Sequence, residues 1–459
     1  MLNDTKLNRR FFMKGVGATA VLGSAMGTVP ASAAGMGQSM SMSTTINFDE
    51  GYNRVDTNSI KFDLIKMFNP GKQLDVGMGI ADMDFKVDPS ITKAINERAK
   101  NEIYGYEMVS DEYYQSIIDW NKERYGLELK KEWIRNSSAL KPGLVAALRG
   151  LNPVKGKVIL QTPTYSGFRG AINRAGMRVE MNPMKKVDGR WHMDLEDLES
   201  RLDYETKCLI LCNPNNPSGE CWTADELRAL GDVCMRHGVT ILADEIWCDF
   251  VRDGARYTPY ASIGEKYAMH SITFKSVSKS FNQASLKVAY FFTSNPDLMD
   301  ATMIGGGHDT GTNTYGRIAA ETAYRQGSNW LNQVNEYLDE NFDFLVNYIN
   351  KPGEMPGVEY QRPEGTYVAW LDCNGLKAKV ATPEHVKVLH DKWRDEGRHQ
   401  QVTPEMVMAE WFVENTGIQL NAGHSYGIGS DGFMRMNITV PRHQLKLALD
   451  NINKALKTL

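Results

Sequence analysis

Residues 271–293 read SITFKSVSKSFNQASLKVAYFFT. An apolar run gives way to a polar stretch and then to a second apolar run at 288–292, which predicts a strand, a polar loop and another strand. Such a loop can hold Lys279 near apolar walls. A partly desolvated lysine loses proton affinity and can form a Schiff base with an aldehyde. A solvated basic turn is the alternative.

Short apolar runs and helical segments alternate through the middle of the chain. The runs of strand length are 158–160, 208–211, 239–243, 272–274 and 288–292, and helical segments are expected at 144–149, 167–175 and 224–237. This alternation predicts an α/β domain whose mainly parallel central sheet is covered by helices on both faces. Such sheets bind ligands at the carboxyl ends of their strands.

The chain is long enough for two folded domains. Its 459 residues are 42% apolar and 24% charged, which is ordinary for globular proteins. Strand candidates at 366–371 and 433–439, with helices around them, predict a smaller α+β C-terminal domain. The expected divisions are a signal peptide at 1–33, a flexible lead-in at 34–45, an N-terminal segment at 46–88 that packs with the small domain and the site, a large domain at 89–325 and the small domain at 326–459.

The N-terminus is typical of a twin-arginine (Tat) export signal. Arg9 and Arg10 precede a small, uncharged segment at 15–29, and Ala31-Ser32-Ala33 supplies the small residues that a signal peptidase needs. A disordered or amphipathic tail is the alternative. Because twin-arginine substrates cross the membrane folded, the pattern predicts a periplasmic protein that uses the Tat export machinery and acquires any cofactor before export.

Composition argues against several other functions. The net charge is −4 and no long basic run occurs in the body, so nucleic acid is not expected as a partner. No stretch is apolar for long enough to span a membrane, so no stable membrane insertion is expected after cleavage. Four of the six cysteines lie in or beside apolar runs and none forms Cys-x-x-Cys, which predicts reduced core residues and no metal site.

Polar motifs stand where the predicted strands end. They are Thr-Pro-Thr-Tyr at 162–165, Asn-Pro-Asn-Asn-Pro-Ser-Gly at 213–219, Asp-Glu-Ile-Trp at 244–247 and the loop that carries Lys279, with Lys-Pro-Gly at 141–143 before the first helix. Each alone reads as a turn or a helix cap. Together and in this order they resemble the fold-type-I pyridoxal-phosphate enzymes of the aminotransferase class I/II superfamily, from Phe48 to about Lys454.

The resemblance is closer to the MalY/PatB branch, whose better-known members are cystathionine-β-lyase-type enzymes. It is carried by Asn-Phe-Asp at 47–49 with Arg54, Thr57 and Ser59, Ala-Asp-Met-Asp-Phe at 81–85, Asp-Glu-Ile at 244–246, Ser-Lys-Ser-Phe-Asn at 278–282 and Gly-Phe-Met-Arg-Met-Asn at 432–437. The strings Ala-Asp-Met-Asp-Phe and Ser-Lys-Ser-Phe-Asn are specific to this branch. Asn-Pro-x-Gly and Gly-Phe alone are weak.

This resemblance implies pyridoxal 5′-phosphate as the cofactor and Lys279 as the catalytic residue. Lys279 would hold the cofactor as a Schiff base and then move the Cα proton of the substrate. Asp244 would pair with the pyridine nitrogen and keep it protonated. Arg435 would clamp the substrate carboxylate as a two-pronged ion pair, with Ile80 and Ala81 beside the substrate.

The remaining implied contacts surround the cofactor ring and phosphate. Asn216 would donate to the ring hydroxyl oxygen, and Tyr165 would stack on the ring face. The phosphate would lie against the backbone N–H groups of Gly143 and Leu144 at a helix start. Further cofactor contacts are implied for Ser276, Ser278, Lys287, Trp247 and, from the neighbouring subunit of a homodimer, Tyr106.

Three positions depart from the family pattern. Lys287 stands where many aminotransferases have arginine, so the charge is kept but the fork is lost. Trp247 stands where tyrosine or histidine is usual, and its indole can donate but cannot shuttle a proton. Gly79 and Phe62 each replace a tryptophan, so we expect a missing wall and a substrate larger than cystathionine.

The favoured function is β-elimination at a C–S bond of an amino acid, giving a keto acid, ammonia and a thiol. Transamination is the close alternative, because both reactions begin when Lys279 removes the Cα proton. A non-catalytic binding protein with the same fold is a third reading. Two other features are expected to be incidental: Gly305-Gly306-Gly307-His308 as a mobile loop near the site mouth, and His424 as a loop histidine satisfied by backbone.

Overall fold

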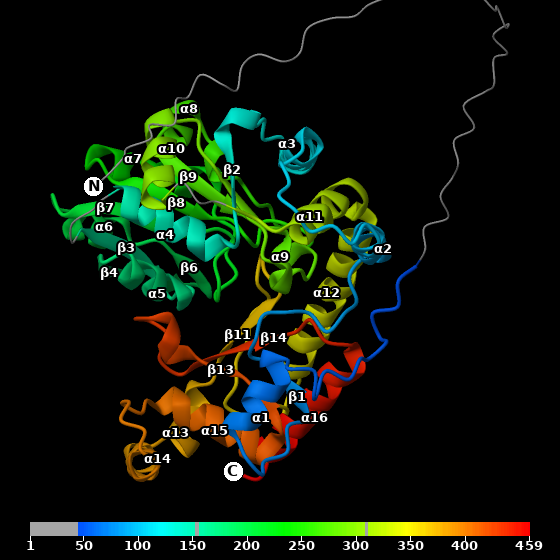
Figure 1. Ribbon diagram of the computed structural model, residues 1–459. Coiled ribbons are helices and arrows are strands. Elements are labelled where there is room, and N and C mark those ends of the chain that lie inside the picture. The colour runs from blue at the N-terminus through cyan, green and yellow to red at the C-terminus, as the bar shows by residue number, and fades with distance from the viewer. Residues whose placement is uncertain (1–44, 152–155, 308–310) are drawn as a thin grey trace, which may run out of the picture. The chain divides into compact units, whose positions relative to one another are not determined.

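The computed structural model of the protein describes residues 45–151, 156–307 and 311–459 (Figure 1). The expected signal peptide, nearly all of the lead-in and His308 lie outside these residues. Thr45–Leu459 forms one compact unit. Within the described ranges, no helix is both long enough and apolar enough to cross a membrane. The expected division between the two domains at 325 and 326 stays a prediction.

A seven-stranded sheet forms the middle of the chain. Its strands, in spatial order, are β2 (Ile134–Ser137), β10 (Ala289–Phe292), β9 (Ser271–Lys275), β8 (Thr240–Asp244), β7 (Thr206–Cys212), β3 (Lys157–Thr162) and β4 (Arg178–Pro183). Only β10 runs antiparallel to its neighbours. The prediction of a mainly parallel sheet is therefore confirmed.

Alternate residues of the central strands enter two separate hydrophobic cores. In β7, Cys208 and Ile210 belong to one core and Leu209 and Leu211 to the other. Because successive side chains of a strand point to opposite faces, both faces of the sheet are covered. All six cysteines are free and buried, which confirms that they are core residues.

Helices cover this sheet and continue into the C-terminal part. They are α2 (Pro89–Ala99), α3 (Asp111–Tyr125), α4 (Leu140–Leu151), α5 (Gly167–Arg174), α6 (Leu195–Arg201), α7 (Ala224–Arg236), α8 (Glu265–Ala268), α10 (Pro296–Gly305), α11 (Thr314–Gln326) and α12 (Ser328–Ile349). Local sequence sets their ends. Thr223 and Glu226 form a capping box at the start of α7, and Gly126, with a φ of 64°, ends α3.

A smaller three-stranded sheet follows, in the order β11 (Val368–Asp372), β14 (Phe433–Asn437) and β13 (Asn421–Ala422). Both strand candidates of this region are present, with ends that differ by at most two residues. Helices α13 (Asn374–Val380), α14 (Pro383–Asp395), α15 (Pro404–Thr416) and α16 (Arg442–Leu456) surround it (Figure 1). All strand pairs in this sheet are antiparallel, as an α+β arrangement requires.

The N-terminal segment joins the C-terminal sheet region. Its strand β1 (Val76–Gly77) pairs in parallel with β12 (Ile418–Gln419). A buried charge cluster stabilises the bend that follows. Lys61 is fully buried and lies 2.7 Å from Asp84, which Arg54 also contacts at 2.6 Å. A buried charge is tolerated when it is paired in this way, so residues 54–84 are tied into one rigid piece.

The stretch at 271–293 folds as two strands, as expected, but its centre is not a loop. Val277–Ser280 forms one turn of helix, α9, and Ser276 caps it by accepting a hydrogen bond from the Ser278 N–H at 3.0 Å. The serine-rich sequence that suggested a loop therefore supplies a helix cap. Lys279 lies on this turn.

Candidate active site

Side chains from many parts of the chain meet in a cavity of about 760 Å³ beside the carboxyl ends of β7, β8 and β9. We call it the Lys279 cavity. Its lining includes most of the residues that the sequence indicated, namely Ile80, Ala81, Tyr165, Asn216, Asp244, Trp247, Ser276, Ser278, Lys279, Lys287 and Arg435. The cavity lies where parallel sheets bind ligands.

The Lys279 side chain is part-buried and forms no ion pair among the described residues. Its Nζ donates one hydrogen bond, to the Ala81 carbonyl oxygen at 2.6 Å. Burial, together with the nearby Arg435 charge, lowers the pKa of Lys279 to about 8. About a tenth of this amine is therefore neutral at pH 7, far more than for an ordinary lysine, and the neutral form is the one that acts as a nucleophile or base.

Asp244 ends β8 and is also buried. Its Oδ1 accepts a hydrogen bond from the Ile246 N–H at 3.1 Å. Burial raises the pKa of Asp244 to about 7, and the charge of Glu245 acts in the same direction. A buried carboxyl group with so few partners is suited to binding a protonated nitrogen of a ligand.

Arg435 reaches the cavity from β14. Its Nη1 donates to Asn216 Oδ1 at 3.1 Å, and its Nη2 donates to the Gly79 carbonyl oxygen at 2.6 Å. Its Nε is buried and has no hydrogen-bond partner in the described part of the chain. A guanidinium group held in place but not neutralised can bind a carboxylate.

Three further cations line the same cavity. They are Lys141, Arg174 and Lys287, and within the described ranges none of them forms an ion pair with a carboxylate. Ser278 lines this region as well. Ser276 differs from the expectation, because its hydroxyl donates to the Val288 carbonyl oxygen at 2.7 Å while it caps α9. The cations together provide a site for a dianion.

Gly143 and Leu144 do not lie at a helix start. Helix α4 begins at Leu140, and the Gly143 N–H already bonds the Ala139 carbonyl oxygen at 3.5 Å. Gly143 packs beside Ser137 and Phe291, and Leu144 is fully buried in the core. The residues of this region that line the cavity are instead 138–142. Any backbone contact to an anion would come from that earlier turn.

Tyr106 does not reach the cavity of its own chain. It is fully exposed, and so is most of the Tyr104-Gly105-Tyr106 segment around it. This position is the one expected for a side chain that serves a neighbouring subunit. Its contact with a cofactor in that subunit stays a prediction.

The expected gap beside Gly79 is filled. A Cβ atom at Gly79 would collide with the side-chain amide of Gln419 and with Asn421 Oδ1. Gln419 also accepts a hydrogen bond from the Gly79 N–H at 2.9 Å. The absent tryptophan is therefore replaced by two amide side chains from the C-terminal region, and the argument for a larger substrate from this position does not hold.

Several residues in or beside the cavity lining were not found from the sequence. Tyr426 lies under the Arg435 guanidinium at 5.4 Å, and Tyr367 donates to the same Ala81 carbonyl oxygen as Lys279, at 2.9 Å. The Tyr367 ring packs edge-on against Trp247, with centroids 4.6 Å apart. These residues come from turns and short strands without a motif, so only the folded chain reveals their position.

The structure also describes two features that were expected to be incidental, the glycine run that begins at Gly305 and the loop histidine His424. Gly305 lies at the end of α10 and packs against Ala146 and Gly150 of α4, so it allows close helix packing. His424 is not satisfied by backbone as expected. Its Nδ1 is buried without a hydrogen-bond partner among the described residues, and burial lowers the pKa of its imidazole.

Comparison with known proteins agrees with this geometry. Residues 74–452 match the family model of aminotransferase class I and II. Cystathionine β-lyase PatB of Bacillus subtilis is 30% identical over 90% of this chain and 100% of its own length. Protein MalY of Escherichia coli is 28% identical over 83% of this chain and 91% of its own length. The crystal structure of the PLP-bound C-S lyase from Staphylococcus hominis superposes with a TM-score of 0.77 at 29% identity, covering 90% of this chain and 98% of that one.

The chain belongs to the aminotransferase class I and II family. Within that family it lies in the branch that includes PatB and MalY, and it has their fold-type-I architecture.

Proposed function

We propose that the protein is a pyridoxal-phosphate-dependent C–S β-lyase that converts an S-substituted amino acid to a keto acid, ammonia and a thiol. The observation that carries the proposal is the Lys279 amine, which shares one cavity with the buried Asp244 carboxyl and the Arg435 guanidinium. The names of the relatives PatB and the Staphylococcus hominis C-S lyase support this choice of reaction.

The residues of the cavity fit this cofactor. Lys141, Arg174 and Lys287 offer unpaired positive charge for a phosphate dianion. Asp244 offers a carboxyl group that gains from a protonated ring nitrogen. Asn216 Oδ1 is used by Arg435, so the amide nitrogen of Asn216 is the group that can donate to a ring hydroxyl oxygen. Tyr165 offers an aromatic face beside Lys141.

Pyridoxal phosphate, when bound, supplies an electron sink for bonds at the substrate Cα. The chain's own groups do the rest. Arg435 binds and orients the substrate carboxylate, with Trp247 and Tyr426 in the wall of the same cavity. Lys279 Nζ, held by the Ala81 carbonyl oxygen, takes the Cα proton and delivers a proton to the leaving sulfur.

Transamination remains the second candidate, because it uses the same residues. The two reactions differ after Cα deprotonation: a lyase expels the group on Cβ, whereas a transaminase passes the amino group to a keto acid. Incubation with an S-substituted cysteine, with and without an added keto acid, distinguishes them. Thiol release without keto acid is expected. Amino transfer that occurs only with keto acid, without thiol, would contradict the proposal.

We infer that the working protein is a homodimer with shared active sites. The support is the full exposure of Tyr106, whose family position contacts the partner's cofactor. Mixing inactive Lys279→Ala with inactive Tyr106→Ala protomers tests this inference. Random pairing of equal amounts makes about half of the dimers mixed, and one of the two sites in each mixed dimer is intact, so shared sites predict recovery of about one quarter of the activity. No recovery after subunit exchange would contradict it.

We also propose export to the periplasm through the twin-arginine route. Its support is the sequence pattern of Arg9 and Arg10 before a small-residue cleavage site. Changing both arginines to lysine is expected to leave the protein in the cytoplasm with its leader attached, while the folded body keeps its activity. Normal appearance of the double variant in the periplasm would contradict this route.

A further inference from the structure

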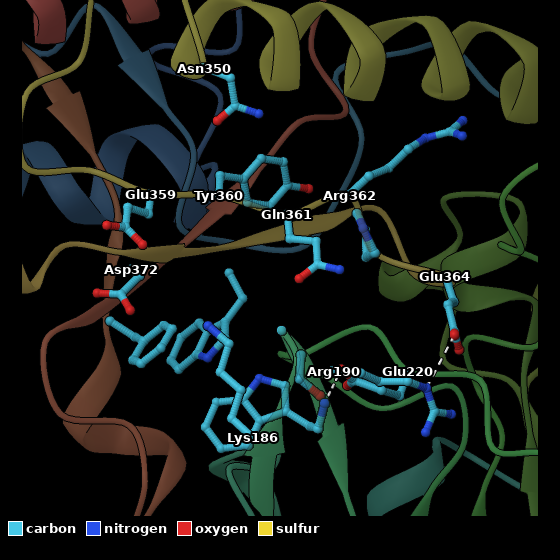
Figure 2. A pocket seen from close by; sticks show the side chains of 16 residues that line it. Lys186, Arg190, Glu220, Asn350, Glu359, Tyr360, Gln361, Arg362, Glu364 and Asp372 are labelled. Atoms are coloured by element: carbon cyan, nitrogen blue, oxygen red, sulfur yellow. Dashed lines mark hydrogen bonds and ion pairs between the residues drawn. The ribbon is translucent and has the colours of Figure 1, made fainter.

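A second cavity of about 430 Å³ lies between the small sheet and the hairpin of β5 (Lys185–Val187) and β6 (Arg190–His192). We call it the Glu220 cavity. Its lining comes from that hairpin, from Ser218 and Glu220 in the turn after β7, from residues 359–364, and from Trp370, Asp372 and Phe433 of the small sheet. Figure 2 shows Glu359 and Asp372 together at one end and Arg190, Glu220 and Glu364 toward the other.

Three buried side chains of this cavity carry polar atoms without hydrogen-bond partners in the described residues: the Tyr360 hydroxyl, one oxygen of Glu220 and the indole N–H of Trp370. Glu220 is 6% exposed; its Oε1 accepts from the Trp191 N–H at 3.1 Å, whereas its Oε2 accepts nothing. Trp370 is 7% exposed, and its indole Nε1–H donates to nothing. Because unsatisfied buried groups are costly, an acceptor and a donor of this kind together indicate a ligand.

Burial sets the state of the Glu220 carboxyl. It raises the pKa of Glu220 to about 7, and the Ser218 hydroxyl and the Trp191 N–H offset only part of this effect. A positive group placed at Oε2 would favour the ionised form and recover the cost of burying it.

The charge balance of the cavity decides the sign of the ligand. Arg190 is already paired with Glu226 at 2.6 Å and Glu364 at 3.3 Å. Arg362 is likewise paired, with Asp339 at 2.8 Å and Asp343 at 3.3 Å.

The carboxylates are less well neutralised than these arginines. Within the described ranges, neither Glu220 nor Glu359 forms an ion pair, and the Asp372 carboxylate accepts only from Asn374. The Arg190 charge acts on Glu220 without forming an ion pair with it. Lys186 is the one unpaired cation among the lining residues, and its Nζ lies over the Phe433 ring at 5.4 Å. The unpaired charge is therefore negative overall, which disfavours anions.

Aromatic rings form one wall of this acidic cavity. Trp370 and Phe433 are stacked, with centroids 5.1 Å apart and planes 11° apart, and Trp191 packs edge-on against Phe433 at 6.0 Å. Aromatic faces beside carboxylates are the surroundings in which proteins bind ammonium groups. From this combination we propose that the Glu220 cavity is a second binding site, for a small organic cation that bears an ammonium group and a hydrogen-bond acceptor.

This site is separate from the Lys279 cavity but adjoins it. Trp370 lies directly opposite Arg435 in the pairing of β11 with β14, and its ring packs on Tyr426 at 5.1 Å. The ammonium ligand would approach Glu220 Oε2, and its acceptor atom would take the Trp370 N–H. Neither contact uses Lys279, so the proposed site does not depend on the proposed reaction.

Choline is the probe for this site, because it has no primary amine and cannot react at Lys279. Titration calorimetry of the isolated holoprotein is expected to show binding with a dissociation constant below about 10 mM. The isostere 3,3-dimethylbutan-1-ol, which has the same shape and no charge, is expected to bind at least about tenfold more weakly. No heat of choline binding, or equal binding of the isostere, overturns the proposal.

Variants locate the site within the protein. Glu220→Gln is expected to weaken choline binding about tenfold, and Glu359→Gln, at an exposed position, about threefold. Glu123→Gln makes the same charge change on α3 away from both cavities and is the control. Lys279→Ala is expected to bind choline normally, which separates this test from that of the proposed reaction. If Glu220→Gln does not fold, the choline affinity of Glu359→Gln decides between the outcomes. Unchanged choline affinity in a folded Glu220→Gln or Glu359→Gln variant contradicts the proposal.

Discussion

The Lys279 cavity and the Glu220 cavity draw on the same strand, β14, yet they gather opposite charge. Arg435 of β14 joins Lys141, Arg174, Lys279 and Lys287 around a single carboxyl, that of Asp244. Phe433, two residues earlier, joins an aromatic wall beside Glu220, Glu359 and Asp372, which form no ion pair in the described part of the chain. In each cavity the informative groups are those that the protein leaves without an ion partner. Such groups mark where a ligand supplies the missing charge.

The same contrast between paired and unpaired groups holds for two lysines that lie four residues apart. Lys275 Nζ lies 3.7 Å from Glu245 Oε2 and donates to Asn121 Oδ1 at 2.9 Å. Within the described ranges, Lys279 donates only to the Ala81 carbonyl oxygen. Lys279 is less buried than Lys275, so its lowered pKa goes with the lack of a carboxylate partner.

Replacing each of these lysines by alanine gives the largest expected effects on activity and on stability. Lys279→Ala is expected to lower the rate of thiol release at least about 1,000-fold, because the base and the covalent anchor are both lost. Its folding stability should change little. Lys275→Ala leaves Glu245 buried without a cation and is expected to cost about 3 kcal/mol of unfolding free energy. Thiol release and urea unfolding of both variants check this contrast, and an active Lys279→Ala enzyme would contradict it.

Asp244→Asn is expected to lower the turnover about 100-fold and yet to stabilise the cofactor-free protein at pH 8. The folded-state pKa of Asp244 is raised to about 7, so its contribution to stability is present below the unfolded-state value and lost as pH rises through 7. The asparagine variant does not ionise, so at pH 8 its free energy of unfolding is expected to exceed that of the wild type by on the order of 2 kcal/mol. Urea unfolding at pH 4 and pH 8 measures it, with a difference expected only at pH 8. Equal stability of the two proteins at pH 8 would count against the burial argument.

Arg435→Lys tests whether an unpaired fork binds the substrate carboxylate. The substitution keeps the charge but loses the two-pronged geometry, so KM is expected to rise about tenfold. Arg190→Lys is the matched control, because the guanidinium of Arg190 is already occupied by Glu226 and Glu364. It is expected to leave KM unchanged. A similar KM in wild type and Arg435→Lys would contradict the assignment of Arg435 as the group that binds the substrate carboxylate.

The smallest expected effect is a pH dependence. Because the pKa of Lys279 is lowered to about 8, the neutral amine becomes available well below the pH at which ordinary lysines react. Capture of pyridoxal phosphate by the cofactor-free protein should speed up about fivefold from pH 7 to pH 8 and level off by about pH 9. Borohydride fixation at timed intervals reports the rate at Lys279. A rate that keeps rising tenfold per pH unit up to pH 10 would contradict the lowered pKa.

The sheet and most of the Lys279 cavity could be predicted because they rest on local patterns. Apolar runs ended by polar motifs placed Asp244, Asn216 and Lys279 at the carboxyl ends of strands. What failed was the start of α4, where Lys141-Pro142-Gly143 reads as a helix boundary although the helix begins at Leu140. Pro142 fits the first turn of a helix, so a helix starting before it was compatible with the sequence.

Contacts between distant segments could not be predicted. Nothing near Gly79 in the sequence indicates that Gln419 and Asn421 fill the space beside it. Tyr367 and Tyr426 likewise carry no motif, and the Glu220 cavity joins a hairpin, a turn and a strand that are far apart in the chain. Such groupings are decided by tertiary packing, which single-sequence patterns do not contain.

Strand β14 also governs when the protein becomes competent during its synthesis. The carbonyl groups of Met78, Gly79, Ile80 and Asp82 accept hydrogen bonds from Asn437 and Arg435, which are made more than 350 residues later. The Ala81 oxygen that holds the reactive amine sits in the middle of this clasp. A nascent chain in which Lys279 is present but β14 is not yet made therefore lacks the clasp, and we expect such a chain to hold its reactive amine less firmly than the folded protein does.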